Sequence, residues 1–118
     1  MSRFAVFTAM LLCFISVMAT PAVSYDTRDA ERYTREAEYY QKQAESYRRE
    51  AEYYQRKAEG YQREAAYYTR KGDADRARDY SRRADRAMES YSDYMKRAAN
   101  ADERAADYHS RAANALRR

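Results

Sequence analysis

Alanine and tyrosine alternate in this chain in a pattern that repeats every seven residues. The alanines are Ala30, Ala37, Ala44, Ala51, Ala58 and Ala65, and the tyrosines are Tyr33, Tyr40, Tyr47, Tyr54, Tyr61 and Tyr68. Alternating spacings of three and four residues put both series on one face of an α-helix, with alanine at heptad position a and tyrosine at d. The pattern therefore predicts a helix that packs against another helix along a narrow Ala/Tyr seam.

The same pattern returns after a break at Gly72 and Asp73. The later a positions are Ala77, Ala84, Tyr91, Ala98, Ala105 and Ala112, and the later d positions are Tyr80, Ala87, Tyr94, Ala101, Tyr108 and Ala115. Gly72 falls on the expected next a position but lies only five residues before Ala77, so the stripe cannot continue in phase along one straight helix. Glycine suits the left-handed end of a helix, and aspartate caps the start of the next. We expect a first helix with fourteen-residue repeats over residues 25–71, a two-residue turn, and a second helix over 74–118.

Folding the chain back at this turn predicts an all-α, antiparallel two-helix coiled-coil hairpin. Most layers of the seam then pair one tyrosine with one alanine, as Ala37 does with Tyr108, which is the large-against-small filling that close packing requires. The exceptions are the Ala–Ala layers Ala58/Ala87, Ala44/Ala101 and Ala30/Ala115, and the layer Tyr54/Tyr91. Ion pairs that flank the seam are expected to set the register. These pairs are Glu64 with Arg83, Glu50 with Arg97, and Glu36 with Arg111.

Apolar side chains also occur outside the seam. Tyr39, Tyr53 and Tyr67 recur every fourteen residues at heptad position c, and Met88, Met95 and Leu116 fall at position e of the second helix. Apolar surface beyond a narrow a/d stripe predicts that another helix packs there. We therefore expect these six residues to form an interaction surface, through which the hairpin dimerises into a four-helix bundle or binds a partner helix.

Residues 1–24 have a different character. Arg3 precedes an apolar run that ends at Ala19, and the small residues Ala22 and Ser24 follow. This order is typical of a secretory signal peptide, and cleavage after Ser24 is favoured. The chain is then exported, to the periplasm or the extracellular space, and keeps no membrane span. An uncleaved segment that anchors the protein in a membrane is the alternative, although the run is shorter than the roughly 20 residues that a bilayer requires.

Charge and composition argue against catalysis and against nucleic acid as a partner. Charged residues make up 36% of the chain, but basic and acidic residues are interleaved and the net charge is only +4. Polyanion binding would be favoured by excess positive charge on one face. His109 is the single histidine, and the single cysteine, Cys13, lies inside the apolar segment. No glycine-rich phosphate loop or nucleophile–base spacing is present, so we expect neither enzymatic activity nor a cofactor.

The sequence thus predicts an exported, non-enzymatic coiled-coil protein that acts as a structural or protein-interaction element. Three alternatives stay open. Rows of Arg and Lys could bind an anionic surface polymer or a membrane surface, and the outer tyrosines could cross-link an extracellular matrix. The outline of a signal segment with two alanine-rich helices is also similar to that of small secreted metal-binding helical hairpins. Here, however, Tyr and Arg occupy the places where those proteins have His and acidic residues.

Overall fold

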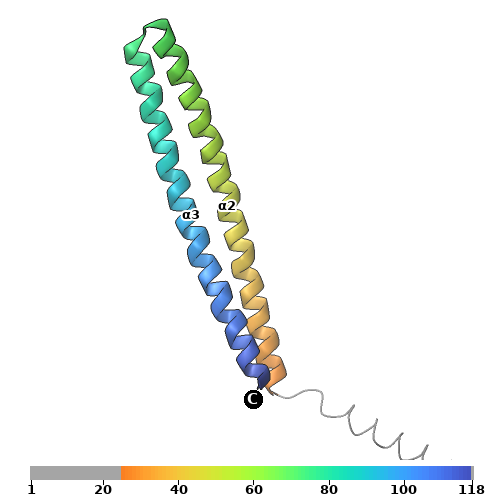
Figure 1. Ribbon diagram of the computed structural model, residues 1–118. Coiled ribbons are helices and arrows are strands. Elements are labelled where there is room, and N and C mark those ends of the chain that lie inside the picture. Colours follow the sequence, from red (N-terminus) through yellow and green to blue (C-terminus); the bar gives the residue numbers. More distant parts are fainter. Residues whose placement is uncertain (1–24, 118) are drawn as a thin grey trace, which may run out of the picture.

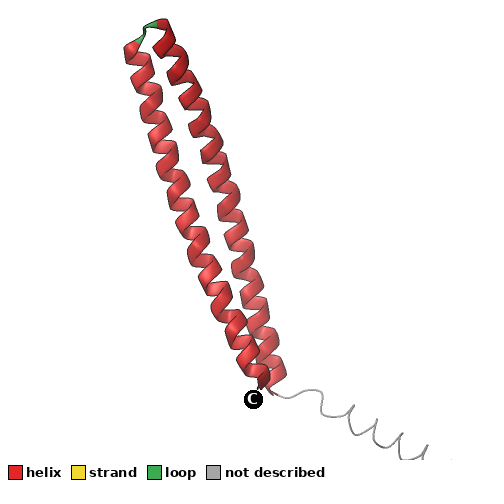
Figure 2. Cartoon of the chain, in the orientation of Figure 1, coloured by secondary structure: helices red, strands yellow, loops and turns green. Residues whose placement is uncertain are grey.

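The computed structural model describes residues 25–117, which form two long helices. Helix α2 spans Tyr25–Lys71 and helix α3 spans Ala74–Arg117. They pack side by side as an extended hairpin 67 Å long (Figure 1). Within this part of the chain, the break in helical structure lies at the turn between them (Figure 2). The predicted all-α hairpin is confirmed, whereas the expected signal segment at 1–24 lies outside the described residues.

Gly72 ends α2 in a left-handed conformation, with φ of 78°. The Gly72 amide donates to the carbonyl of Thr69 at 3.1 Å, and the Asp73 amide donates to the carbonyl of Tyr68 at 3.0 Å. These two bonds form a Schellman motif, which satisfies carbonyls that the end of a helix otherwise leaves without partners. A side chain is disfavoured at this φ because its Cβ would crowd the neighbouring carbonyl oxygen. The backbone therefore favours glycine here.

Asp73 begins α3 as its N-cap. Its carboxylate Oδ1 accepts from the amide of Arg76 at 3.1 Å, and its carbonyl accepts from the amide of Ala77 at 3.1 Å. Asp75 adds a negative charge to the first turn, which favours the positive end of the helix dipole. The direction of the chain thus reverses within two residues, because one ends a helix and the next starts another.

The aromatic contacts define how the two helices are aligned. The ring centroid of Tyr108 lies 6.1 Å from that of Tyr33 and 5.7 Å from that of Tyr40. Ala37 is midway between these two tyrosines in sequence, so Tyr108 sits at the level of Ala37. This is the layer that the sequence predicts for a turn at Gly72.

The seam has an alanine side and a tyrosine side. Every fully buried residue of the described chain is an alanine, and the tyrosines at the d positions are half-buried. The rings also contact one another rather than covering alanine alone. Tyr54 stacks on Tyr94, with centroids 5.6 Å apart, so the ring partner of Tyr54 is not the Tyr91 that simple layering predicts. In an antiparallel pair the d side chains of both helices lean toward the same edge, which brings ring against ring.

A matched pair of glycine substitutions tests the role of the turn. Gly72→Ala should lower the free energy of unfolding by about 1 kcal/mol, because alanine disfavours the left-handed conformation. Nothing lies within 4 Å of the added Cβ, so the cost is purely conformational. Gly60→Ala should raise the same quantity by about 0.8 kcal/mol, because Gly60 is helical and the added Cβ meets only the tip of Arg63 at 4.0 Å. Urea unfolding followed by circular dichroism measures both. Effects of the same sign at the two positions would contradict this account of the turn.

Candidate functional site

Tyrosine rings gather in three groups along one edge of the hairpin. In each group, one tyrosine of α3 inserts between two of α2, and we call these groups the tyrosine trios. They are Tyr61–Tyr80–Tyr68, Tyr47–Tyr94–Tyr54 and Tyr33–Tyr108–Tyr40. In every trio one ring pair is stacked, with centroids 5.6 to 5.7 Å apart, and the other is tilted, at 6.1 to 6.2 Å. Such contacts contribute beyond the area that they bury, by about 0.5–1.5 kcal/mol per pair.

Hollows separate the trios because α3 alternates tyrosine and alanine at its d positions. Where α3 places Ala101, no ring enters the space between Tyr40 and Tyr47, and a hollow of about 310 Å³ remains. Ala87 leaves a second hollow of about 220 Å³ between Tyr54 and Tyr61. We call these the Ala101 hollow and the Ala87 hollow. They coincide with two of the predicted Ala–Ala layers, so their positions could be read from the sequence, although their chemical lining could not.

Arginine side chains of α3 cover the rings of this edge. The guanidinium carbons of Arg83, Arg97 and Arg111 lie 5.1, 5.0 and 5.0 Å from the ring centroids of Tyr80, Tyr94 and Tyr108. Arg104 lies across the seam over Tyr40, at 5.5 Å. A guanidinium is attracted to the face of an aromatic ring. Its N–H donors lie in its own plane, so stacking orients the group while leaving those donors free to bind an anion.

The arginines expected to set the register are the ones that cover these rings. The pairing of Arg83, Arg97 and Arg111 with Glu64, Glu50 and Glu36 stays a prediction. The ion pair that joins α2 to α3, within the described residues, is instead Arg48 with Asp102. Exposed pairs contribute only about 0–1 kcal/mol, so an exposed arginine gains as much from a ring beside it as from a carboxylate.

The outer tyrosines extend the same edge. Tyr39, Tyr53 and Tyr67 are 55%, 45% and 45% exposed. Each meets the next tyrosine in sequence edge to face, with centroids 5.1 to 5.2 Å apart. The trios and these three residues together make up the aromatic edge. The outer rings thus lean on the trios rather than standing alone, but about half of each ring still faces solvent.

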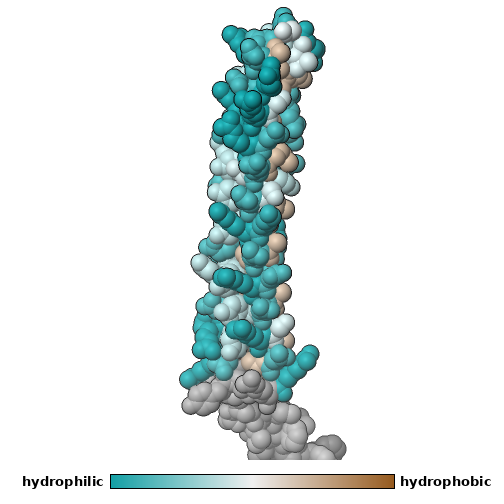
Figure 3. Space-filling view, turned by 90° about the vertical axis from the view of Figure 1, so that its left-hand side faces the viewer, coloured by the Kyte–Doolittle hydropathy of each residue, from teal (hydrophilic) through white to brown (hydrophobic). Residues whose placement is uncertain are grey.

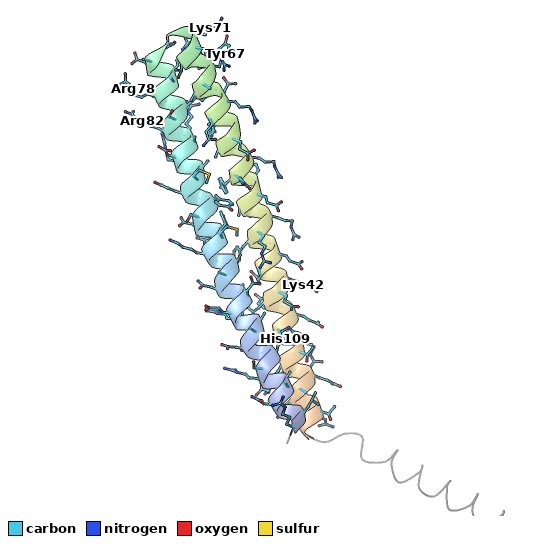
Figure 4. All side chains as sticks on the ribbon, viewed as in Figure 1. Lys42, Tyr67, Lys71, Arg78, Arg82 and His109 are labelled. Atoms are coloured by element: carbon cyan, nitrogen blue, oxygen red, sulfur yellow. The ribbon has the colours of Figure 1, made fainter. Side chains whose placement is uncertain are left out.

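Each outer tyrosine also contacts the side chain four residues later. Gln43 donates to the Tyr39 hydroxyl at 3.3 Å, and the Lys57 ammonium lies 5.0 Å from the ring centroid of Tyr53. Lys71 lies 5.6 Å from the ring centroid of Tyr67, and Figure 4 places this pair at the turn end of α2. The pKa of Lys57 is raised, chiefly by its hydrogen bond with Tyr53.

The predicted interaction residues of α3 lie along a different edge. Met88, Met95 and Leu116 are 40%, 39% and 66% exposed, and the neighbouring heptad column contributes exposed alanines. Those alanines are Ala99, Ala106 and Ala113. The six residues form what we call the methionine edge. His109 shares the heptad column of the methionines, lies between the helices in Figure 4, and is 3.0 Å from the amide nitrogen of Gln41. The structure therefore divides the predicted surface into a tyrosine part and a methionine part.

Among the described residues, no three or more His, Cys, Asp or Glu side chains form a group that could hold a metal ion. Neither α2 nor α3 is apolar enough along its length to cross a bilayer. The chemistry available on the aromatic edge is that of cationic hydrogen-bond donors beside ring faces.

Removing one ring of a trio should cost more stability than removing an outer ring. Tyr94→Ala should lower the free energy of unfolding by about 2 kcal/mol, because a half-buried ring with two aromatic partners is lost. Tyr53→Ala should lower it by less than about 1 kcal/mol, because that ring is 45% exposed. Urea unfolding of both variants measures the difference. Equal losses would show that the trios do not hold the helices together.

Comparisons with protein-family models, curated proteins and solved structures found no match for this chain. Its function is therefore inferred from the contacts, burial and charges of its own residues.

Proposed function

We propose that this protein is an exported, non-enzymatic coiled-coil hairpin that acts as a structural or protein-interaction element. Two copies associate through their methionine edges into a four-helix bundle. The observation that carries this proposal is the composition of the buried core, in which every residue is alanine. Burying a methyl group contributes about 0.8 kcal/mol, whereas burying a Leu or Ile side chain contributes about 1.5–3 kcal/mol. A single hairpin of this length therefore has a weak core, and a second copy adds the apolar burial that it lacks.

The shape of the methionine edge favours a helix as the partner. Ala99, Ala106 and Ala113 recur every seven residues and are exposed, so small side chains follow one another along the C-terminal half of α3. Small side chains let a second helix approach closely, and flexible methionines such as Met88 and Met95 fill the irregular gaps beside it. Figure 3 shows the hydrophobic residues as a broken line along one edge of the rod. A line of this form fits an elongated partner better than a globular one.

Charge selects α3 rather than α2 as the helix that meets the partner. The corresponding column of α2 is almost entirely acidic: Glu31, Glu38, Glu45, Glu52 and Glu59, with Ala66 at its end. Two such columns would repel each other across an interface, whereas two alanine stripes would not. A second copy supplies a stripe of the same length and width, so both stripes are covered at once and the assembly closes.

A matched pair of alanine substitutions tests the association. We expect light scattering after size exclusion to give the mass of two copies for the purified chain. Ala106→Glu should give the mass of one copy, because a carboxylate would be buried between the helices. Ala66→Glu should leave the mass of two copies, because that exposed alanine lies on α2. Circular dichroism checks that both variants keep their helices.

Two results would count against the proposal. The first is a chain that stays a monomer at every concentration up to about 100 μM. The second is an equal loss of association in both variants, which would show that added charge alone, and not its place on the methionine edge, separates the copies.

A further inference from the structure

We propose that the Ala101 and Ala87 hollows are binding sites for the carboxylate of a sugar acid. In each hollow, the sugar ring would pack on tyrosine and the carboxylate would bind the basic side chains of α3. This inference concerns the aromatic edge and is independent of the association through the methionine edge.

The two hollows are built to the same plan. Each is bounded by two successive d tyrosines of α2, has an alanine of α3 as its floor, and has basic residues of α3 at its rim. The Ala101 hollow is lined by Arg97 and Arg104, and the Ala87 hollow by Arg83 and Arg86. The tyrosines, the alanine and one arginine thus recur after fourteen residues, whereas Ser90 and Lys57 of the Ala87 hollow stand where the Ala101 hollow has Arg104 and Gln43.

Three of the rim arginines are oriented by tyrosine rings and, in this arrangement of the described side chains, are not in an ion pair. Arg97 and Arg83 lie over Tyr94 and Tyr80, and Arg104 lies over Tyr40. The arginines that form ion pairs, within the described part of the chain, are Arg32, Arg48, Arg76 and Arg78. A stacked guanidinium presents paired N–H donors whose geometry matches both oxygens of a carboxylate. Binding would therefore require little rearrangement of these side chains.

No acidic residue lines either hollow. Along α2, the heptad column at this edge reads Glu36, Gln43, Glu50, Lys57 and Glu64. The residues without a carboxylate, Gln43 and Lys57, are the ones that line the hollows. Positive charge is thus concentrated at the hollows, while Glu50 lies between them and Glu36 and Glu64 lie beyond them.

The glutamate between the hollows also constrains the ligand. Glu50 lies in this column midway between Gln43 and Lys57, where it would repel a ligand with charge along its whole length. A nucleic acid strand carries a phosphate at every nucleotide, which disfavours it here. Fourteen residues of helix place the two hollows about 21 Å apart. A sugar acid in each hollow avoids Glu50, whether the two acids are free or belong to one chain in which the sugars between them are neutral.

Tyrosine is suited to the body of such a ligand. Both hollows are open to solvent on one side, and tyrosine presents an apolar ring face together with a hydroxyl that can bind polar groups. The C–H face of a sugar can pack on the ring while its hydroxyls remain in water. A fully apolar ligand would stay partly exposed in so shallow a site.

Isothermal titration of the purified chain with galacturonate, and with an oligosaccharide that carries two galacturonates separated by neutral sugars and is long enough to span both hollows, tests the proposal. Galactose and dextran are the neutral controls and should not bind. If the natural ligand is a free sugar acid, the monomer and the oligomer should bind with similar affinity per sugar. If it is an acidic polysaccharide, the oligomer should bind at least about 100-fold more tightly, because the second hollow is then engaged within one complex.

Charge-matched variants localise the binding. Arg97→Gln with Arg104→Gln should weaken oligomer binding at least about tenfold, because two charge-assisted contacts are lost. The control is Arg82→Gln with Arg117→Gln, which removes the same charge away from the hollows; Arg82 projects away from α2 in Figure 4. This control should bind like the unchanged chain.

A second variant tests the contribution of the open space separately from that of the positive charge. Ala101→Tyr keeps both arginines but fills the space between Tyr40 and Tyr47, so it should abolish binding at that hollow while the helices persist in circular dichroism. Three results would overturn the proposal: no binding of either ligand at about 10 mM, equal weakening by the Arg82/Arg117 control, or tighter binding of a thymidine oligonucleotide than of the oligosaccharide with two galacturonates.

Discussion

The contact on which the hairpin depends is the insertion of each d-position tyrosine of α3 between two tyrosines of α2. The ring of Tyr108 lies against Tyr33 and Tyr40 in this way, and Ala37 is at the same level. Alanine at the a positions keeps side-chain volume low on one side of the seam, so the helices can approach closely. The rings fill the other side, where a wider space is left. A seam made only of alanine would bury too little surface, and a seam made only of tyrosine would hold the helices apart.

This division gives the two edges of the rod different chemistry. On the aromatic edge, half-buried rings meet arginine side chains, and Arg97 over Tyr94 is one example. On the methionine edge, small and flexible apolar side chains such as Met95 lie beside polar bridges such as Arg48 with Asp102. The first edge is suited to anions and polar rings, and the second to another helix. The two partners that we propose would therefore bind at separate edges of one hairpin, without competition between them.

Repetition extends both properties along the rod. The d positions of α3 alternate tyrosine with alanine, so a trio and a hollow follow each other every fourteen residues. Long rods with repeated weak sites gain affinity from several contacts with one ligand, because the second contact forms at a high effective concentration. This gain in affinity comes from the repetition of the hollows and not from the affinity of any single hollow.

The sequence alone determined the helices, the turn and the alignment of the seam. Each depends on local chemistry: the seven-residue period selects a buried face, the positive φ at Gly72 favours glycine, and Asp73 caps the helix that follows. With the turn in place, the partner of each layer follows by counting residues. The expected Ala–Ala layers at Ala87 and Ala101 also marked where the hollows would lie.

Only the tertiary structure decided what surrounds those layers. It placed Tyr54 against Tyr94 and put the rings of both helices on one edge, because neighbouring rings attract one another once both helices lean the same way. It also set Arg97 over a ring rather than beside a carboxylate. The two arrangements of the side chain differ by only a fraction of a kcal/mol, so heptad positions alone do not predict which one forms. It separated the outer tyrosines from Met88, Met95 and Leu116, because heptad positions c and e point to different edges of an antiparallel pair. Periodicity places a residue on a helix face, but the packed partner helix determines which side chains share an edge.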